Sequence, residues 1–229
     1  MLKKSVLFVL FLNFIFAAAF SQEAIITANE YFKSVSEKYG TIKDYQANVD
    51  IVVNKENMQA ELTYLSPDKV RFDFSRPDNQ VIVFNGETLT IYLPGSAAVL
   101  TQNANAGDSG GGSKAANLAT SEGLSLMRRY YSVSYETSQE AVPLEEGSEE
   151  MVVRLVLWRR TTAEAFRYIK LSINPDTKMI RRVEAVTPSN ITYMMTFSDY
   201  EVNQGLTAQR FSYDIPSAAN VYDNFMFSE

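Results

Sequence analysis

Carboxylates are the only plausible acid and base groups for catalysis in this sequence, because it contains no His and no Cys. Candidates inside segments with strand-like alternation are Asp50, Asp73, Glu184 and Asp199. Two carboxyl groups facing each other across a cleft could hydrolyse a glycosidic bond. Each of these, however, falls on or near the polar phase of its strand, where a solvated charge is expected. We therefore predict that the protein is not an enzyme.

The missing His and Cys limit other chemistry as well. Without them there is no Cys–His nucleophile pair and none of the usual zinc sites. The glycines at 110–112 do not make a phosphate-binding loop, since no Gly-Lys-Ser or Gly-Lys-Thr follows them. The formal charge of −6 argues against nucleic acid as a partner and against adsorption to an anionic membrane. We predict no metal, no cofactor and no nucleic-acid partner.

Aromatic, aliphatic and Met side chains are the remaining candidates, and each could either fill a core or line a cavity. Taken singly, either role fits such a residue about equally well. Taken together, a curled single-layer sheet covered by few helices leaves apolar surface that a ligand could fill. The predicted ligand-binding residues of the cavity and its helical lid are Tyr31, Phe32, Val35, Leu62, Tyr64, Val70, Phe72, Phe74, Ile82, Phe84, Leu89, Ile91, Leu93, Leu124, Met127, Tyr193, Met195 and Phe197.

The stretch from Leu62 to Leu93 predicts four consecutive strands that would carry many of these residues. Pro presets the φ angle that turns need, and Asn-Gly tolerates positive φ. The residues between successive strands therefore favour turns for a physical reason. Val70, Phe72 and Phe74 alternate with polar residues, which gives one apolar face. The turn signals are Ser66-Pro67-Asp68, Arg76-Pro77-Asp78-Asn79 and Asn85-Gly86.

A two-residue turn at Asn85-Gly86 would place Ile82 opposite Leu89, and directly opposed residues share a face. The apolar residues of both strands would then line the same side. We predict from this stretch a curved antiparallel surface suited to binding an apolar ligand.

Two helices are predicted. Thr27 and Glu30 match a capping box at the start of a helix over residues 27–39, and Gly40 fits a C′ glycine at its end. Apolar spacing indicates a second helix over residues 118–131, with basic residues near its end. Further strands are predicted at 45–53, 59–65, 97–101, 132–137, 151–160, 166–173, 179–186, 191–200 and 211–215.

The first residues are typical of an export signal. A basic start is followed by an apolar run from Val6 to Phe20 and small residues, which predicts a signal peptide over residues 1–21 and a periplasmic protein. A membrane anchor is the alternative, although a span needs about 20 residues. Residues 22–229 would form a single domain with a flexible loop at about 102–117, rich in Gly, Ser and Asn. A domain linker is the less favoured interpretation of that loop.

The predicted fold class is mainly β with two or three helices (α+β), since so many strands in one sheet must curl. Several short segments resemble the LolA-like family of periplasmic outer-membrane lipoprotein carriers. They are residues 64–72, residues 85–94, Asn174-Pro175-Asp176-Thr177 and residues 211–216. The resemblance implies an unclosed antiparallel β-barrel with a helical lid over an apolar cavity that holds acyl chains.

The resemblance also implies partners. Such a carrier takes acylated lipoproteins from an inner-membrane exporter and passes them to an outer-membrane acceptor, and we expect a monomer. The sequence departs from the family at Ser66 and Val70, where the best-studied carriers have an Arg and an aromatic residue. The alternative function is a regulatory protein with the same fold that senses lipids or lipoproteins in the cell envelope.

Overall fold

The computed structural model describes residues 25–103 and 120–225. The predicted signal peptide and most of the predicted loop at 102–117 lie outside these residues. The helices are α2 (Ala28–Gly40) and α3 (Ser121–Tyr130), with short 3₁₀ turns η1 (Pro94–Ser96) and η3 (Ala208–Phe211). The strands are β1 (Asp44–Val53), β2 (Glu56–Leu65), β3 (Lys69–Arg76), β4 (Val81–Phe84), β5 (Thr88–Leu93), β6 (Ala98–Asn103), β7 (Tyr131–Tyr135), β8 (Val142–Pro143), β9 (Met151–Arg159), β10 (Tyr168–Ile173), β11 (Ile180–Val186), β12 (Thr192–Val202) and β13 (Asn220–Asp223).

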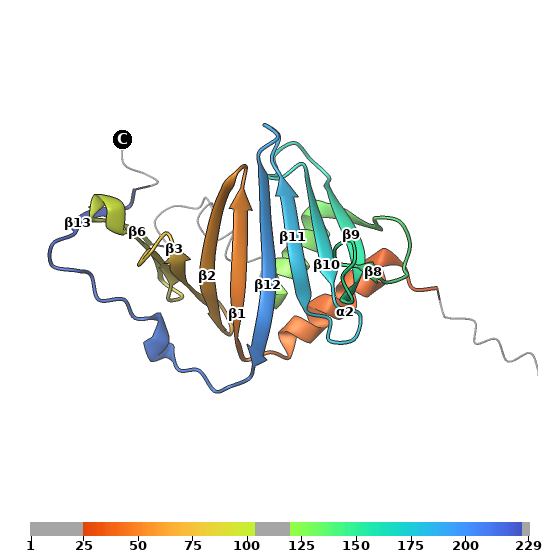
Figure 1. The fold of residues 1–229 in the computed structure, drawn as a ribbon, viewed down its shortest axis with the longest axis horizontal. Helices are drawn as coiled ribbons and strands as arrows, with labels where there is room; N and C mark the ends of the chain where they lie inside the picture. Colours follow the sequence, from red (N-terminus) through yellow and green to blue (C-terminus); the bar gives the residue numbers. More distant parts are fainter. Residues whose placement is uncertain (1–24, 104–119, 226–229) are drawn as a thin grey trace, which may run out of the picture.

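All strands belong to one sheet in the order β13-β6-β5-β4-β3-β2-β1-β12-β11-β10-β9-β7, and β8 pairs with β9 beside this path. Neighbouring strands along this order are antiparallel except β13, which runs parallel to β6. The edge strands β7 and β13 do not pair with each other within the described residues, so the sheet curls without closing (Figure 1). The predicted fold class, mainly β with an unclosed sheet and two helices, is confirmed.

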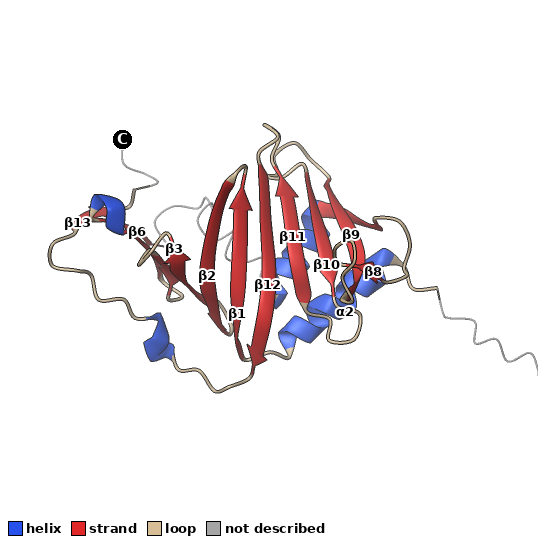
Figure 2. Ribbon diagram, in the orientation of Figure 1, coloured by secondary structure: helices blue, strands red, loops and turns tan. Residues whose placement is uncertain are grey.

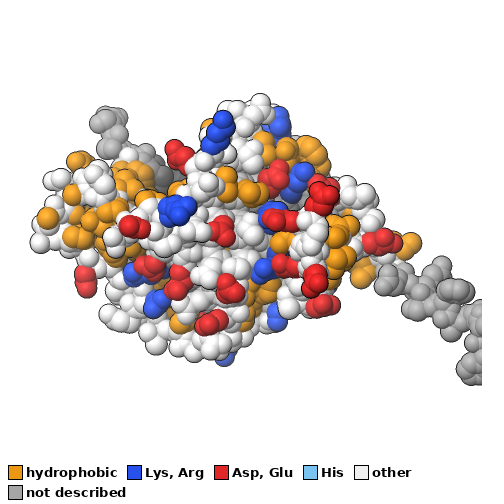
Figure 3. All heavy atoms as spheres, viewed as in Figure 1, with side chains coloured by type: hydrophobic (Ala, Val, Ile, Leu, Met, Phe, Trp, Pro, Cys, Tyr) orange, Lys and Arg blue, Asp and Glu red, His pale blue; other side chains and the backbone are white. Residues whose placement is uncertain are grey.

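Both helices lie on the same side of the sheet, behind its β9–β12 half (Figure 2). They pack against each other and against β7. The apolar face of α2 contributes Tyr31, Phe32 and Val35 to the main core, where the latter two are fully buried. The opposite face of the sheet, toward the viewer in Figure 3, carries Lys, Arg, Asp and Glu side chains among neutral polar ones. The sheet is therefore apolar toward the helices and polar away from them.

The start of α2 follows the sequence prediction, and its end does not. The Thr27 hydroxyl accepts a hydrogen bond from the backbone N–H of Glu30, and the Glu30 carboxylate accepts one from the Thr27 N–H, which completes the capping box. Gly40 was expected just beyond the helix but is its last residue, with Thr41 as the C-cap. A β-carbon at Gly40 would lie 3.2 Å from the Ser121 hydroxyl of α3, so the glycine permits a close approach of the two helices.

Serines complete this helix–helix contact. Ser121 Oγ donates to the Ser36 carbonyl at 2.9 Å, and Ser36 Oγ donates to the Ser121 carbonyl at 3.2 Å. Ser36 Oγ also lies 2.9 Å from Ser125 Oγ. Small hydroxyl side chains at these positions add hydrogen bonds between the two helices. The second helix is shorter than predicted, because Tyr131 begins β7.

The β4–β5 connection differs from the predicted two-residue turn. Ile82 pairs with Ile91, and Phe84 pairs with Leu89. The Asn85 side chain accepts hydrogen bonds from the N–H groups of Glu87 and Thr88, at 2.9 and 2.8 Å, and this lengthens the turn. The expected pairing of Ile82 with Leu89 is wrong by two residues. A shift of two keeps every side chain on its predicted face.

The predicted strand at 211–215 is absent. After β12 the chain instead runs across the face of the sheet that turns away from the helices, as the segment we call the strap (residues 203–219), and then adds β13 beside β6 (Figure 1). Phe211 is 1% exposed and packs against Val81 and Val83, which point away from the helices. Arg71 Nη1 donates to the carbonyls of Arg210 and Ser212, at 3.0 and 3.1 Å.

The beginning of the strap is fixed at the foot of β1. The buried Asp44 carboxylate accepts hydrogen bonds from the N–H groups of Gln204 and Gly205, at 2.7 and 3.1 Å. Asn203 Oδ1 accepts a hydrogen bond from the Lys43 N–H at 2.8 Å. The strap is thus held at its start by Asp44, in its middle by Phe211 and Arg71, and at its end by β13.

A partly buried ion pair at the β7 end of the sheet makes stability depend on pH. The Lys170 ammonium donates to Glu136 at 2.8 Å and lowers the pKa of that carboxyl below its ordinary value of 4.5. A depressed carboxyl pKa stabilises the fold above the ordinary pKa, and that contribution is lost as pH falls through the folded-state value. We expect Glu136→Gln to cost about 0.5 kcal/mol at pH 7 and less at about pH 3, measured by urea unfolding.

The control for this prediction is Glu140→Gln, because Glu140 is exposed and makes no ion pair within the described part of the chain. It should leave the free energy of unfolding unchanged at both pH values. An equal loss in Glu136→Gln at both pH values would show that packing, and not the charge, is responsible.

Candidate functional site

An apolar cavity of about 310 Å³ lies between the concave face of the sheet and the end of α2. This volume falls within the range of pockets that bind small ligands. Every residue lining it is aliphatic, aromatic or Met, with no charged side chain among the described residues. The lining residues are Tyr39, Tyr45, Ile51, Leu62, Val70, Phe72, Phe74, Ile82, Phe84, Leu89, Ile91, Ile180, Val183, Met195, Phe197 and Tyr200.

The cavity has a fully packed side and a more open side. On the packed side, Leu62 of β2, Ile51 of β1 and Val183 of β11 are buried. On the other, Phe72, Ile82 and other residues of β3 to β5 are only half-buried, although their side chains are large and apolar. Half-buried apolar groups gathered in this way leave surface that a ligand could cover. The helices lie over the other half of the sheet, so this side is where a ligand could enter.

Tyrosines form one end of the cavity with their hydroxyl groups bonded. The Tyr200 hydroxyl donates to the Ile180 carbonyl at 2.8 Å, and the Tyr39 hydroxyl accepts from the Ile180 N–H at 3.1 Å. Burial raises the pKa of Tyr39, and it raises the pKa values of Tyr45 and Tyr200 well above the ordinary 10.0. These residues therefore stay neutral at physiological pH and contribute aromatic surface to the cavity.

Most of the predicted site residues of the sheet lie together in this cavity. The reason is strand periodicity: residues two apart share a face, and strands paired in register extend that face across the sheet. For example, Leu62 pairs with Phe72, which pairs with Ile82. The predicted residues that line the cavity are Leu62, Val70, Phe72, Phe74, Ile82, Phe84, Leu89, Ile91, Met195 and Phe197.

The other predicted site residues lie outside the lining of this cavity. Those on the helices (Tyr31, Phe32, Val35, Leu124 and Met127) are buried in the core between helices and sheet. Tyr64 is buried beside Tyr45, and its hydroxyl donates to the Pro67 carbonyl at 3.1 Å. Tyr193 packs edge-on against Phe166, and Leu93 is half-buried at the end of β5.

Several lining residues were not predicted: Tyr39, Tyr45, Ile51, Ile180, Val183 and Tyr200. Ile51 and Val183 had a usable signal, because each continues the apolar phase of a predicted strand. Tyr45 shares the phase of Ile51 in the same strand, and Tyr39 lies on the apolar stripe of α2, but their place at the cavity depends on how α2 turns into β1. Tyr200 lies just after Asp199, whose positive φ of 51° interrupts the alternation of β12.

The strand carboxylates do not converge on a reaction centre. Asp50, Asp73 and Glu184 each neighbour a cavity-lining residue in their strand, so they point to the opposite face. Asp73 makes a bidentate pair with Arg71, at 2.7 and 2.8 Å. Asp199 accepts a hydrogen bond from Asn48 at 2.9 Å. These contacts support the fold rather than acid–base catalysis.

Two short serine motifs occur in the sequence, and only one of them lies in the described residues. Ser66-Pro67-Asp68-Lys69 has Ser-x-x-Lys spacing, but the Lys69 ammonium donates to the Asn85 carbonyl at 2.7 Å across the turn. The Gly-x-Ser-x-Gly pattern at 107–111 lies outside the described residues. A serine nucleophile needs a positioned base, and in this structure the Lys69 ammonium is directed to the Asn85 carbonyl.

Within the described residues, no helix combines the length and the apolar character that a membrane span requires. Residues 50–214 match the model of a protein family described as "Outer membrane lipoprotein carrier protein LolA". No curated protein matches the sequence.

Solved structures share the fold at low identity. An uncharacterized conserved protein from Thermus thermophilus is 16% identical, with a TM-score of 0.55 over 84% of this chain and 96% of that one. The MucA/MucB complex structure from Pseudomonas aeruginosa gives 13% identity and a TM-score of 0.50 over 85% of this chain. The present chain covers 63% of that MucA/MucB chain.

Proposed function

The chain belongs to the LolA family of outer membrane lipoprotein carrier proteins, and we propose that it carries the acyl chains of lipoproteins in its apolar cavity. The observation that supports this most directly is the cavity itself, whose described lining contains no charged side chain. An apolar lining offers an acyl chain an environment similar to that of a membrane. The residues that line the cavity are the proposed binding residues.

The physical need for such a carrier is large. Exposing an acyl chain to water costs about 0.8 kcal/mol per methylene group, or on the order of 12 kcal/mol for sixteen carbons. A lipoprotein therefore cannot cross an aqueous compartment at a useful rate unless its chains are covered. Because membrane and cavity resemble each other, transfer between them needs little net binding energy. It depends on opening the cavity and on partners, and not on bond chemistry.

The proposed location and partners follow from this role. The predicted signal peptide would deliver the protein to the periplasm, where an inner-membrane exporter would load it and an outer-membrane acceptor would unload it. The position of the family Arg is Ser66 here, and Ser66 is exposed in the turn after β2. A lid latch based on that Arg is absent, so the serine contacts between α2 and α3 are the proposed restraint on helix movement.

Native mass spectrometry of the protein, purified without detergent from a Gram-negative envelope, tests the proposal. We expect an adduct with the mass of a lipid or an acylated peptide. We also expect the adduct to disappear when acceptor vesicles are added, because a carrier must release its cargo.

Two other outcomes would contradict the carrier proposal. A clean apo mass, with no uptake of an added triacylated lipopeptide, would mean that the cavity is only an imperfectly filled core. A stable adduct that vesicles never remove would favour the alternative function, a sensor that holds its lipid ligand and responds to it.

A further inference from the structure

A group of arginines at one corner of the sheet forms no ion pair with a carboxylate in the described residues. They are Arg128, Arg129, Arg159, Arg160 and Arg167. Their contacts are with neutral groups: Arg128 Nε lies 3.4 Å from Asn29 Oδ1, and Arg160 Nε donates to the Tyr131 carbonyl at 3.2 Å. These cations are available to an external anion.

The fold brings these arginines together from three separate segments. Arg128 and Arg129 lie in the last turn of α3, which leads directly into β7. The Arg160 N–H donates to the Tyr130 carbonyl at 2.9 Å, which ties the end of β9 to the end of α3. The Arg159 N–H donates to the Arg167 carbonyl at 3.3 Å, which adds the residue before β10.

Exposed aromatic side chains lie at the same rim of the sheet. Trp158 precedes Arg159 in β9 and therefore points to the opposite face, so the two faces meet at this rim. Trp158 is 50% exposed and Tyr130 is 48% exposed, although both are large and apolar over most of their surface. The Trp158 ring lies 5.1 Å from the ring of Tyr168. The Arg167 guanidinium stands 5.6 Å from the centre of the Tyr168 ring. We call this set of arginines with Tyr130, Trp158 and Tyr168 the basic–aromatic corner.

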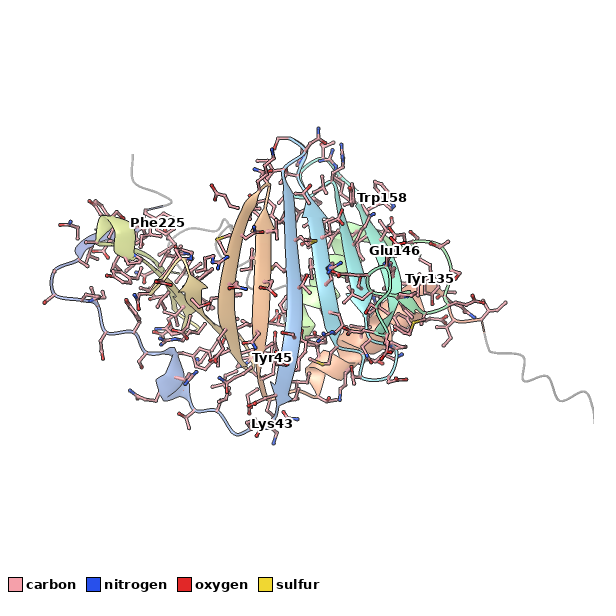
Figure 4. All side chains as sticks on the ribbon, viewed as in Figure 1. Lys43, Tyr45, Tyr135, Glu146, Trp158 and Phe225 are labelled. Carbon is pink, nitrogen blue, oxygen red and sulfur yellow. The ribbon has the colours of Figure 1, made fainter. Side chains whose placement is uncertain are left out.

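The charge of the corner is opposite in sign to that of the protein. The chain carries −6 overall, whereas the loop from Arg160 to Arg167 contains one carboxylate, Glu164, between two arginines. Figure 4 labels Trp158 at the upper rim of the sheet, and Lys43 at the opposite, lower rim. A local excess of positive charge in an acidic protein favours an anionic partner at this rim.

We propose that the basic–aromatic corner docks the protein on the surface of a membrane that contains anionic phospholipids. Trp and Tyr partition to the headgroup region, where the ring meets acyl chains and the polar tip stays in water. Arg side chains bind phosphate with paired N–H donors, while an anionic surface attracts them from a distance. This docking does not depend on the cavity function proposed above.

A membrane fits the corner better than an acidic protein does. The Trp158 side chain is half exposed and lies beside cations. Exposed Trp next to basic residues is typical of protein surfaces that contact the membrane–water interface. The cations come from the ends of α3, β9 and β10, and a lipid surface can adapt its headgroups to such a spread.

Trp158 is the only Trp of the chain, so its fluorescence reports directly on the corner. The exported protein is titrated with vesicles of phosphatidylcholine containing about 30% phosphatidylglycerol, and with phosphatidylcholine vesicles alone. We expect a blue shift of the emission and co-sedimentation with the anionic vesicles only. Salt at about 0.5 M should weaken both effects, because it screens the attraction.

The variant Arg129→Gln/Arg159→Gln removes two cations whose side chains make no ion pair in the described part of the chain, and should weaken vesicle binding by about tenfold or more. The matched control is Lys38→Gln/Lys43→Gln, which removes Lys43 at the opposite rim and Lys38 in the last turn of α2, and should bind as the unmodified protein does. Thermal unfolding verifies that both variants are folded.

Three results would overturn the proposal. The protein could bind neutral vesicles as well as anionic ones, or the control variant could lose as much vesicle binding as Arg129→Gln/Arg159→Gln. Alternatively, the protein could co-sediment with anionic vesicles while the Trp158 emission stays unchanged. A blue shift caused by soluble polyglutamate but not by anionic vesicles would also overturn it, in favour of an acidic protein partner. Loss of cavity loading in the native mass spectrum, with vesicle docking intact, would reject the carrier function and leave this docking surface standing.

Discussion

Phe72→Asp should abolish the loading of acyl chains, with at least a hundredfold loss of affinity, or about 2.8 kcal/mol. Phe72 lies between Leu62 and Ile82 across β2, β3 and β4, and all three line the cavity. A carboxylate there would have to be desolvated by a bound acyl chain, with no cationic residue in the described lining to pair with it. Lipopeptide binding measured by native mass spectrometry, or by displacement of a fluorescent fatty acid, would reveal the loss.

Ser75→Asp is the matched control, because it adds the same charge to the same strand at an exposed position outside the cavity. It should bind lipopeptide as the unmodified protein does. Since Phe72 is only half-buried, we expect the empty Phe72→Asp protein to remain folded, which circular dichroism can verify. Retained loading in a folded Phe72→Asp protein would contradict the assignment of the cavity as the binding site.

Phe211→Ala should destabilise the protein by about 3 kcal/mol, which is typical for removing a buried aromatic ring. The ring is 1% exposed and packs with Val81 and Val83 on the face away from the cavity. Part of the loss should be local, because the alanine variant leaves the strap with its polar anchors and the ring contact between Tyr213 and Tyr92. Urea unfolding measures the total effect, and hydrogen exchange of residues 203–223 measures the local one.

Tyr222→Ala is the control for Phe211→Ala, because it removes another aromatic side chain from the C-terminal segment. Tyr222 is 54% exposed, so its removal should change stability by no more than about 0.5 kcal/mol. Acyl-chain loading should survive in both variants, since neither residue lines the cavity. A loss below 1 kcal/mol in Phe211→Ala would mean that the strap contributes little to the fold.

Most of what could be predicted came from the alternation of apolar and polar residues along single strands. In β3, Val70, Phe72 and Phe74 were assigned to one face from spacing alone, and all three line the cavity. The β4–β5 pairing was predicted in the wrong register, yet Ile82 and Leu89 still share the cavity face. A face assignment survives an error of two residues because side chains repeat every two residues.

Contacts between distant elements could not be predicted in the same way. Tyr31 and Phe32 were expected to line the cavity or its lid because they lie on the apolar stripe of α2. The spacing of apolar residues along a helix, however, does not indicate which part of the sheet the helix covers. The structure places them over the half that is filled by the core. Tyr39, in the last turn of the same helix, reaches the cavity instead.

The C-terminal segment shows a different limit. Phe211, Tyr213 and Ile215 alternate with polar residues, which is typical of a strand, but only Phe211 is buried. The alternation here comes from single side chains that dock on an existing sheet, and no backbone ladder forms. The partly buried Arg71–Asp73 pair reaches the carbonyls of Arg210 and Ser212, which are far away in sequence, so no local pattern indicates these bonds.

The strap joins the foot of β1 to the far edge of the sheet, because Asp44 holds its start and β13 pairs with β6 at its end. Strands β2 to β6 lie between these two points, and they include those that form the open side of the cavity. A covalent tie of fixed length across the outside of these strands restricts how far they can flatten. We therefore expect the length of the strap to set the largest volume to which the cavity can expand for a larger cargo. Inserting residues into the strap should then shift the preferred cargo toward longer or more numerous acyl chains.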